Sequence, residues 1–367
     1  MLNKPMQKTL LAGLVAATMG HTAIAAEDKV LYIYNWSDYI AEDTIANFEA
    51  ETGIDVVYDV FDSNEVLEAK ILSGNTGFDI VVPTSDFLAA QIQAGAFLPL
   101  DKSKLSNYGN LDASLMKVLE NADPGNTYSF PYLWGTTGIG YNVDKVAEIL
   151  GEDAPVNSWD LVFKPEYMEK LSSCGVSFLN APTEIMSAAL NYLGKDPNST
   201  NAKDYQEALE LLKPIRPYVT YFHSSQYIND LANGDICVSV GWSGDVLQAS
   251  DRAYEADNGV EVAYVIPDEG AMAWFDMLAI PKDAKHPENA HLFLNYLLRP
   301  EVIADVTNYV WYANPNPSSN EFIDEEILEH EGIYPTAAAS EKLYSPKLTP
   351  LKISRVINRA WSELMKN

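Results

Sequence analysis

The 367-residue chain carries 24 Lys and Arg against 52 Asp and Glu, which sets its formal net charge at −28. This acidity argues against nucleic acid or an anionic membrane as a partner, and it is compatible either with a cationic ligand or with a surface that only confers solubility. With 47% hydrophobic residues and this length, the chain is expected to form two lobes or domains, each with its own core.

The first residues have the features of a secretion signal. Lys4 and Lys8 precede an uncharged stretch over residues 9–20, and Ala23-Ile24-Ala25 supplies the small-x-small pattern read by signal peptidase. The stretch is shorter than the about 20 apolar residues of a membrane span, and no cysteine follows it to carry a lipid. We expect residues 1–25 to be removed, which leaves a periplasmic chain of charge −30 that begins near Ala26.

Strands and helices alternate in the first part of the mature chain. Short apolar runs predict the strands, and apolar residues at helical spacing, with Gly53 and Gly74 as stop signals, predict the helices. The expected elements are strand 30–34, helix 43–52, strand 54–60, helix 64–72 and strand 78–82. This βαβαβ order is typical of an α/β lobe.

The alternation restarts in the middle of the chain. The expected elements are strands 175–179, 219–222, 236–241 and 260–266, helices 182–193, 205–213 and 245–253, and a short helix that ends at Gly234. Gly135–Gly140 lacks the complete dinucleotide-binding pattern, so we expect a turn there. The whole pattern predicts two α/β lobes joined by structured crossovers.

The loops after the expected strands repeat one combination, an aromatic residue beside a carboxylate. Ligands of open α/β sheets bind beyond the carboxyl ends of the strands, where such loops converge. The loop segments are Asn35-Trp36-Ser37-Asp38-Tyr39, Thr84-Ser85-Asp86-Phe87, Glu184, Trp242-Ser243-Gly244-Asp245 and Ala273-Trp274-Phe275-Asp276.

An alkyl diamine or triamine matches this combination. Its ammonium groups lose hydration in a cleft and need carboxylates, whereas its methylene chain prefers aromatic walls, whose ring faces also attract cations. Each residue also has a simpler interpretation. A single loop aspartate, such as Asp38, Asp86 or Asp245, is more often a helix N-cap, and a single Trp is usually a core residue.

Patterns of enzymes and metal sites are incomplete in this chain. In Gly241-Trp242-Ser243-Gly244-Asp245, an aspartate replaces the second glycine of a nucleophile elbow. No HExxH is present, and the five histidines show no metal-ligand spacing. We therefore expect no enzymatic activity, no cofactor and no metal.

The two cysteines, Cys174 and Cys237, belong to a chain that is expected to be exported. An even number in an oxidising compartment favours a disulfide, with two buried thiols as the alternative.

Six longer runs carry a family resemblance. They are YNWSDYI at 34–40, FDSNEVLEAK at 61–70, PYLWGTTGIGYN at 131–142, YFHSSQYINDLANGDICV at 221–238, WFDMLAIPKDAK at 274–285 and YANPNP at 312–317. The chain resembles the periplasmic putrescine- and spermidine-binding proteins of polyamine ABC importers over essentially its whole mature length. The resemblance implies a type II periplasmic binding fold, with two α/β lobes joined by crossover strands and a ligand cleft between them.

The resemblance also implies lobe boundaries, partners and a site. We expect residues 26–134 with 276–322 in one lobe and 135–275 with 323–367 in the other, a disulfide between Cys174 and Cys237, a membrane permease as partner, and a monomer. Asp276 and Glu184 are expected to bind amine groups along the ligand, and Asp38 and Asp245 to bind one end. The full expected ligand set is Trp36, Ser37, Asp38, Tyr39, Thr84, Asp86, Glu184, Trp242, Asp245, Trp274, Asp276 and Tyr312, with Trp36, Trp242, Trp274 and Tyr312 around the methylenes.

The ligand preference within this family depends on a few positions. Asp86 stands where relatives tend to carry a neutral residue, and Trp274 resembles the spermidine type. Asp38, Ala181 and Asp245 resemble the putrescine type. We expect a slight preference for spermidine, with another cationic or polar solute, or a secreted polyamine-modifying enzyme, as alternatives.

Overall fold

The computed structural model describes Met1 and residues 27–366, so the expected signal peptide and its cleavage site lie outside the described residues. Nine strands of the described chain form one mixed sheet in the order β2-β1-β3-β9-β4-β7-β5-β6, with β8 paired to β4. The strands are β1 (Val30–Trp36), β2 (Asp55–Phe61), β3 (Ile80–Val81), β4 (Ser129–Asn142), β5 (Val176–Phe178), β6 (Tyr221–Phe222), β7 (Val238–Trp242), β8 (Val262–Val265) and β9 (Met272–Ala279).

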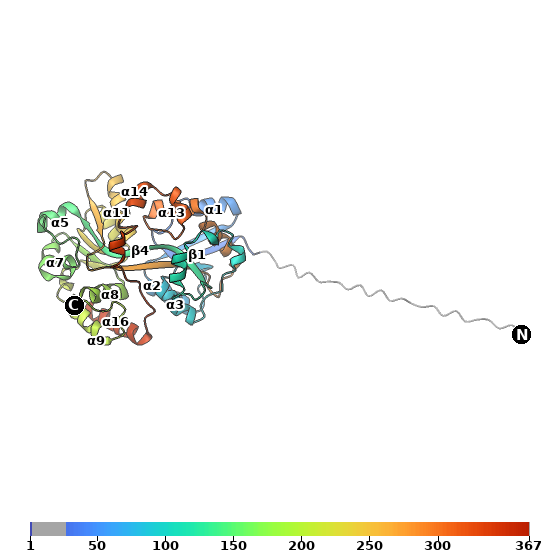
Figure 1. Cartoon of the computed structure of the whole chain (residues 1–367), viewed down its shortest axis with the longest axis horizontal. Coiled ribbons are helices and arrows are strands. Elements are labelled where there is room, and N and C mark those ends of the chain that lie inside the picture. Colours follow the sequence, from blue (N-terminus) through green and yellow to red (C-terminus); the bar gives the residue numbers. More distant parts are fainter. Residues whose placement is uncertain (2–26, 367) are drawn as a thin grey trace.

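Two strands cross between the two lobes. β1, β2 and β3 are parallel on one side, β5, β6 and β7 are parallel on the other, and the antiparallel pair β4 and β9 runs between the two groups. β4 pairs with β9 through its first half and with β7 and β8 through its second half. Figure 1 shows this pair running across the molecule, with α1, α2, α3 and α13 at one end and α5, α7, α8, α9 and α16 at the other.

Helices cover the sheet in both lobes. They are α1 (Thr44–Thr52), α2 (Asn64–Leu72), α3 (Ser85–Gln93), α4 (Ala113–Leu119), α5 (Val143–Leu150), α6 (Asp160–Phe163), α7 (Pro165–Leu171), α8 (Pro182–Tyr192), α9 (Ala202–Leu212), α10 (Gln226–Ala232), α11 (Ser243–Glu255), α12 (Pro287–Leu297), α13 (Pro300–Val310), α14 (Glu325–Glu329), α15 (Ala337–Ser340) and α16 (Leu351–Leu364), with 3-10 turns at Lys102–Lys104, Tyr108–Asn110, Arg216–Tyr218 and Pro317–Glu321. No helix within residues 27–366 is long and apolar enough to span a bilayer. We call the β1–β3 side, with α1–α4, α12 and α13, the first lobe, and the β5–β8 side, with α5–α11 and α16, the second lobe.

Local sequence accounts for several helix ends, and the predicted alternation of strands and helices is confirmed. α1 ends at Gly53, whose left-handed φ of 66° closes the last turn. α2 begins after Ser63, whose Oγ accepts a hydrogen bond from the backbone N–H of Val66 at 3.4 Å. α9 begins earlier than expected because the side chain of Asn201 caps it through the N–H of Lys203.

The turn expected at Gly135–Gly140 is wrong, because this segment lies inside the 14-residue strand β4. The glycines are there because side chains from distant segments approach the strand closely. A Cβ at Gly135 would lie 2.8 Å from Ser243 Oγ and 2.9 Å from the ring of Tyr312, and one at Gly140 would lie 2.6 Å from a methyl group of Val246.

The two cysteines form a disulfide, as predicted. Cys174 precedes β5 and Cys237 precedes β7, so the bond joins the starts of two neighbouring parallel strands. It therefore braces the sheet of the second lobe at the edge opposite to the loops that follow these strands.

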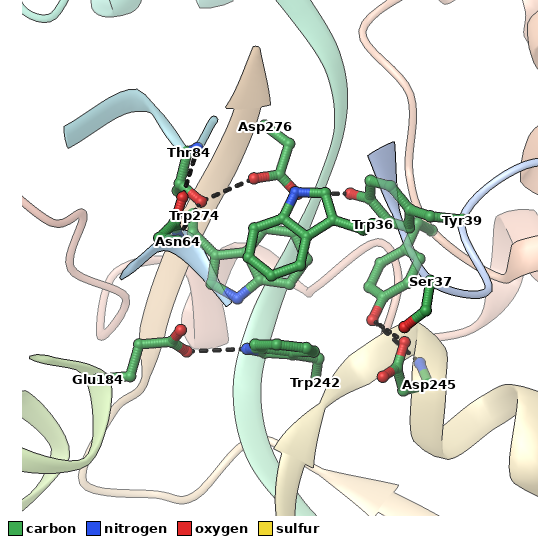
Figure 2. A pocket seen from close by; sticks show the side chains of 11 residues that line it. Trp36, Ser37, Tyr39, Asn64, Thr84, Glu184, Trp242, Asp245, Trp274 and Asp276 are labelled. Atoms are coloured by element: carbon green, nitrogen blue, oxygen red, sulfur yellow. Dashed lines mark hydrogen bonds between the residues drawn. The ribbon is translucent and has the colours of Figure 1, made fainter. Parts of the chain in front are cut away.

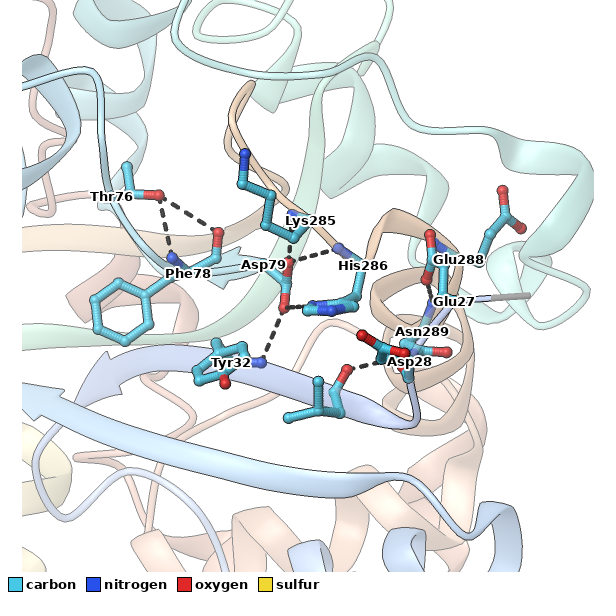
Figure 3. A network of polar contacts seen from close by, with 11 residues as sticks. Glu27, Asp28, Tyr32, Thr76, Phe78, Asp79, Lys285, His286, Glu288 and Asn289 are labelled. Atoms are coloured by element: carbon cyan, nitrogen blue, oxygen red, sulfur yellow. Dashed lines mark hydrogen bonds and ion pairs between the residues drawn. The ribbon is translucent and has the colours of Figure 1, made fainter. Parts of the chain in front are cut away.

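A buried carboxylate organises the first lobe (Figure 3). Asp79, which directly precedes β3, accepts hydrogen bonds from the backbone N–H groups of Tyr32, Lys285 and His286 at 2.8–3.0 Å. Nδ1 of His286 lies 2.9 Å from the same carboxylate. Because Asp79 links β1 and the start of α12 to β3, it holds the strand whose far end leads to Thr84.

Candidate functional site

A cavity lies between the lobes, beyond the ends of β1 and β7 and beside β4 and β9. Both lobes contribute to its walls, which is why residues far apart in the chain meet there. The lining residues are Trp36, Ser37, Tyr39, Asn64, Thr84, Glu184, Trp242, Asp245, Trp274, Asp276 and Tyr312. Figure 2 shows Asp276, Glu184 and Asp245 on different sides of a group of aromatic rings.

Asp276, on β9, is the buried carboxylate of the first-lobe wall. It is 3% exposed and accepts hydrogen bonds from the hydroxyls of Tyr39 at 2.9 Å and Thr84 at 2.8 Å. Asn64 in turn holds Thr84, donating to its hydroxyl at 2.7 Å and accepting from its N–H at 3.1 Å. Burial raises the pKa of Asp276 from 3.8 to about 7, although the two hydroxyls lower it.

Asp245 stands on the second-lobe wall, in the first turn of α11. It is 5% exposed and accepts hydrogen bonds from the hydroxyls of Tyr227 at 2.8 Å and Tyr312 at 2.7 Å. Burial raises the pKa of Asp245 to about 7, against the lowering effect of the two phenols. The N-cap of α11 is Trp242, so Asp245 is not the cap that its loop position allowed.

Glu184, in the first turn of α8, is the third carboxylate of the cavity. The Thr137 hydroxyl donates to it at 2.6 Å and the Trp242 indole N–H at 2.9 Å. Burial raises the pKa of this carboxyl, while the two donors lower it. Within residues 27–366, Asp245, Asp276 and Glu184 have no ion pair with a lysine, arginine or histidine.

Aromatic rings separate the carboxylates. Trp242 lies edge-on to Trp36, with ring centroids 5.4 Å apart, and to Trp274 at 6.3 Å. Tyr312 contacts Trp274 at 5.5 Å and Tyr39 at 5.1 Å. The indole N–H groups of Trp36 and Trp274 are satisfied by the Val82 carbonyl at 2.9 Å and the Thr137 hydroxyl at 3.2 Å, which locks the rings in place.

A second cavity adjoins the first, and we call it the side chamber. Both are lined by Trp36, Asn64, Thr84, Glu184, Trp242 and Trp274, and the side chamber adds Ser63, Glu65, Asp86, Phe87, Ala181, Thr183, Met272 and Pro346. Burial raises the pKa values of Glu65 and Asp86 to about 7 each. Asp86 lies in the first turn of α3, whose N-cap is Thr84.

The structure gathers ten of the twelve expected ligand residues around the first cavity and Asp86 around the side chamber. Asp38 lines neither cavity. It lies in the turn after β1 with a φ of 54°, and its carboxylate pairs with Arg252 at 2.8 Å. Sequence reasoning missed Asn64 and Glu65, although both lie in the run 61–70, directly after the strand β2.

The chemistry of the lining points to a cation. None of the residues that line either cavity is Lys, Arg or His. Among residues 27–366, no group of His, Cys, Asp and Glu side chains is arranged to hold a metal ion. The walls therefore combine desolvated carboxylates and apolar rings, which together match a ligand with cationic and aliphatic parts.

Comparisons with known proteins agree with this geometry. A family profile described as bacterial extracellular solute-binding protein matches residues 43–333. The chain is 59% identical over 365 residues to the putrescine-binding periplasmic protein PotF of Escherichia coli strain K12, covering 99% of this chain and 98% of that protein. It is 55% identical over 361 residues to the putrescine-binding periplasmic protein SpuD of Pseudomonas aeruginosa strain UCBPP-PA14, covering 98% of each. A solved structure titled putative spermidine/putrescine ABC transporter, from Listeria monocytogenes, has a TM-score of 0.82 at 34% identity, over 92% of this chain and 99% of that one.

Proposed function

The chain belongs to the bacterial extracellular solute-binding proteins, and we propose that it captures a polyamine between its lobes and delivers it to the membrane permease of an ABC importer. One observation carries the proposal. Asp245 and Asp276 are buried and Glu184 is half-buried, none of the three carboxylates has a basic partner within residues 27–366, and they surround aromatic rings in one cavity. The names of the relatives PotF and SpuD, both putrescine-binding, support the same ligand class.

A diamine complements each part of this cavity. An ammonium group donates three hydrogen bonds and accepts none, so it suits carboxylates whose remaining lone pairs are already oriented by Tyr and Thr hydroxyls. Asp276 and Glu184 bind amine groups along the ligand, and Asp245 binds one end. The rings of Trp36 and Trp274 flank the methylene chain and attract the neighbouring charges.

Other solutes suit the cavity less well. An amino acid or peptide carries a carboxylate, and the lining offers no Lys, Arg or His to bind it. A sugar has no charge to offset three desolvated carboxylates. Another aliphatic cation is the remaining alternative.

The side chamber suits a longer polyamine. Glu65 and Asp86 add two carboxylates beyond Glu184, where the aminopropyl arm of spermidine would leave the first cavity. We assign Asp86 to the third ammonium group. The chain then binds both putrescine and spermidine, and Asp86 favours the triamine.

Binding is expected without chemical change of the ligand. Ser243, the serine of the incomplete nucleophile elbow, accepts a hydrogen bond from the N–H of Thr136 at 3.3 Å, and no histidine lines the cavity to activate it. We place the mature chain in the periplasm as a monomer. We propose that the chain passes from one lobe to the other after residues 134, 275 and 322. The first two of these residues, Trp134 and Phe275, face each other in the β4–β9 pair.

Calorimetry with ligand-stripped protein tests the proposal. The chain is unfolded and refolded without reductant, to remove bound ligand and keep the disulfide, and is then titrated with putrescine, spermidine, a dicarboxylate and an amino acid. We expect tight binding of the amines alone, unchanged amine on recovery by mass spectrometry, and a more compact scattering profile with ligand because lobe closure is favoured by binding. Absence of amine binding, or turnover of the amine, would overturn the proposal.

A further inference from the structure

One face of α11 carries three polar residues at helical spacing, Asp245, Gln248 and Arg252. Residues three and four apart lie on the same side of a helix, so the three form one row along α11. Asp245 begins the row at the cavity wall. Gln248 and Arg252 continue it away from the cavity, and both reach across to the first lobe.

Gln248 joins α11 to two segments of the first lobe. Its side chain is 4% exposed, and its amide nitrogen donates to the carbonyls of Asp38 at 3.3 Å and Val310 at 3.1 Å. Val310 is the last residue of α13, and a helix leaves its final carbonyls without intrahelical partners. Gln248 thus satisfies a carbonyl that would otherwise be buried without a partner when the lobes are together.

Arg252 completes the contact at its solvent side. Its guanidinium donates to the Asp38 carboxylate at 2.8 Å and to the Asn229 side chain of α10 at 2.8 Å. It also donates to the amide oxygen of Gln248 at 3.4 Å, which orients the amide nitrogen toward the first lobe. Arg252 is 34% exposed and Asp38 35%, whereas Gln248 is buried.

We propose that Gln248, supported by Arg252, is an interlobe clasp that sets how slowly the bound polyamine is released, and that Asp38 belongs to this clasp rather than to the ligand contacts. The inference rests on the proposed function. The turn that Gln248 and Arg252 hold is the one that carries Trp36, Ser37 and Tyr39 to the cavity wall. Opening the cleft breaks all of these interlobe bonds, so the clasp acts on dissociation and leaves capture by the open form unchanged.

Stopped-flow tryptophan fluorescence tests the clasp, because three Trp rings line the cavity. Putrescine association and dissociation rates are measured for the full mature chain and for Gln248→Leu, Arg252→Ala, Asp38→Asn and the double variant Arg252→Ala/Asp38→Asn. Gln206→Leu, at an exposed site on α9, is the matched control.

We expect different results for the buried Gln248 and for the more exposed ion pair between Arg252 and Asp38. Gln248→Leu should raise the dissociation rate about tenfold, independently of salt, with the association rate within about twofold of the wild type, since mutants of one binding site differ mainly in dissociation. Arg252→Ala and Asp38→Asn should each raise it about threefold at low salt and less at 0.5 M salt, because salt screens an exposed pair. The double variant should equal Arg252→Ala, since Asp38→Asn weakens only the contact with Arg252, which Arg252→Ala already removes.

Two outcomes would overturn the clasp. Dissociation rates within twofold of wild type for Gln248→Leu and Arg252→Ala would show that the contacts do not control release. An additive double variant with a lowered association rate would return Asp38 to the ligand contacts. If Gln248→Leu does not fold, judged by circular dichroism, the salt-dependent pair decides.

Failure of the proposed function is separable from failure of the clasp. If the wild type binds no polyamine in calorimetry, the proposed function fails. If the wild type binds putrescine and the variants release it at the wild-type rate, the clasp alone fails.

Discussion

Asp276→Asn should have opposite effects on ligand affinity and on the stability of the ligand-free protein. The substitution keeps the size and shape of the side chain and removes only its charge. Asp276 accepts hydrogen bonds from Tyr39 and Thr84, and one amide oxygen can retain part of this pattern. The fold should therefore survive, and the effect should fall on the ammonium partner.

The loss of affinity follows from the burial of the site. A hydrogen bond to a charged group contributes about 1.5 to 3 kcal/mol, and removing one partner of a buried charge pair costs about 2 to 5 kcal/mol. With Asp276 at 3% exposure, we expect a loss of about 3 kcal/mol, which corresponds to roughly 150-fold weaker polyamine binding.

The gain in stability follows from the raised pKa of Asp276. A carboxyl whose pKa is higher in the folded than in the unfolded state stabilises the fold below its unfolded pKa, near 3.8, and this contribution is lost as the pH rises through about 7. With a pKa raised from 3.8 to about 7, keeping the Asp276 carboxylate ionised at alkaline pH lowers the free energy of unfolding by at most about 4 kcal/mol. The neutral amide avoids this cost, so ligand-free Asp276→Asn should unfold at a higher temperature than the wild type at pH 8, and the difference should shrink at pH 5.

Calorimetric titration and thermal unfolding at pH 5 and pH 8, both on ligand-stripped protein, measure the two effects. Asp153→Asn, at an exposed position between α5 and α6, is the matched control and should change neither quantity. Unchanged putrescine affinity in Asp276→Asn would refute the assignment of this carboxylate. A lower unfolding temperature at pH 8 would instead refute the account of its buried charge.

Three further predictions concern the side chamber, the ionisation of the site and the disulfide. Asp86→Ser should weaken spermidine binding much more than putrescine binding in calorimetry, because only the triamine loses a partner for one of its ammonium groups. Equal, small changes in the two affinities would show that Asp86 only stabilises the start of α3. Putrescine affinity should fall as the pH is lowered from 8 to 6, because Asp245 and Asp276, with pKa values of about 7, must ionise to bind a cation; titrations in two buffers should reveal proton release, and a flat profile over this range contradicts the prediction. Replacing both Cys174 and Cys237 by Ala should lower the free energy of unfolding by about 2 to 4 kcal/mol in denaturant titrations and leave affinity within about twofold, and a stability equal to that of the wild type would assign the disulfide no stabilising role.

Elements with a strong local pattern could be predicted from the sequence. Apolar runs and glycine stops predicted β1, α1, β2 and α2 to within one or two residues, because these signals act over a single turn or strand. Loop position also predicted most of the cavity lining. Trp36 ends β1, and Glu184 and Asp245 follow the ends of β5 and β7; the ends of such strands converge in an α/β fold.

The features that the sequence did not predict depend on contacts between segments that are far apart in the chain. Gly135 and Gly140 looked like turn residues, yet they lie in β4, at positions where Tyr312 and Val246 leave no room for a side chain. Asn64 lines the cavity, where it bonds to Thr84 on another segment.

Asp38 is the clearest example of the difference between what the local sequence determines and what the tertiary contacts determine. Its place in a loop of carboxylates and aromatic residues, together with the family resemblance, predicted a ligand contact. In the structure its side chain meets Arg252, 214 residues away, because α11 of the second lobe packs against the turn after β1. A local sequence determines which groups a loop carries, whereas the direction in which each group points depends on the charge that the opposite lobe brings to it.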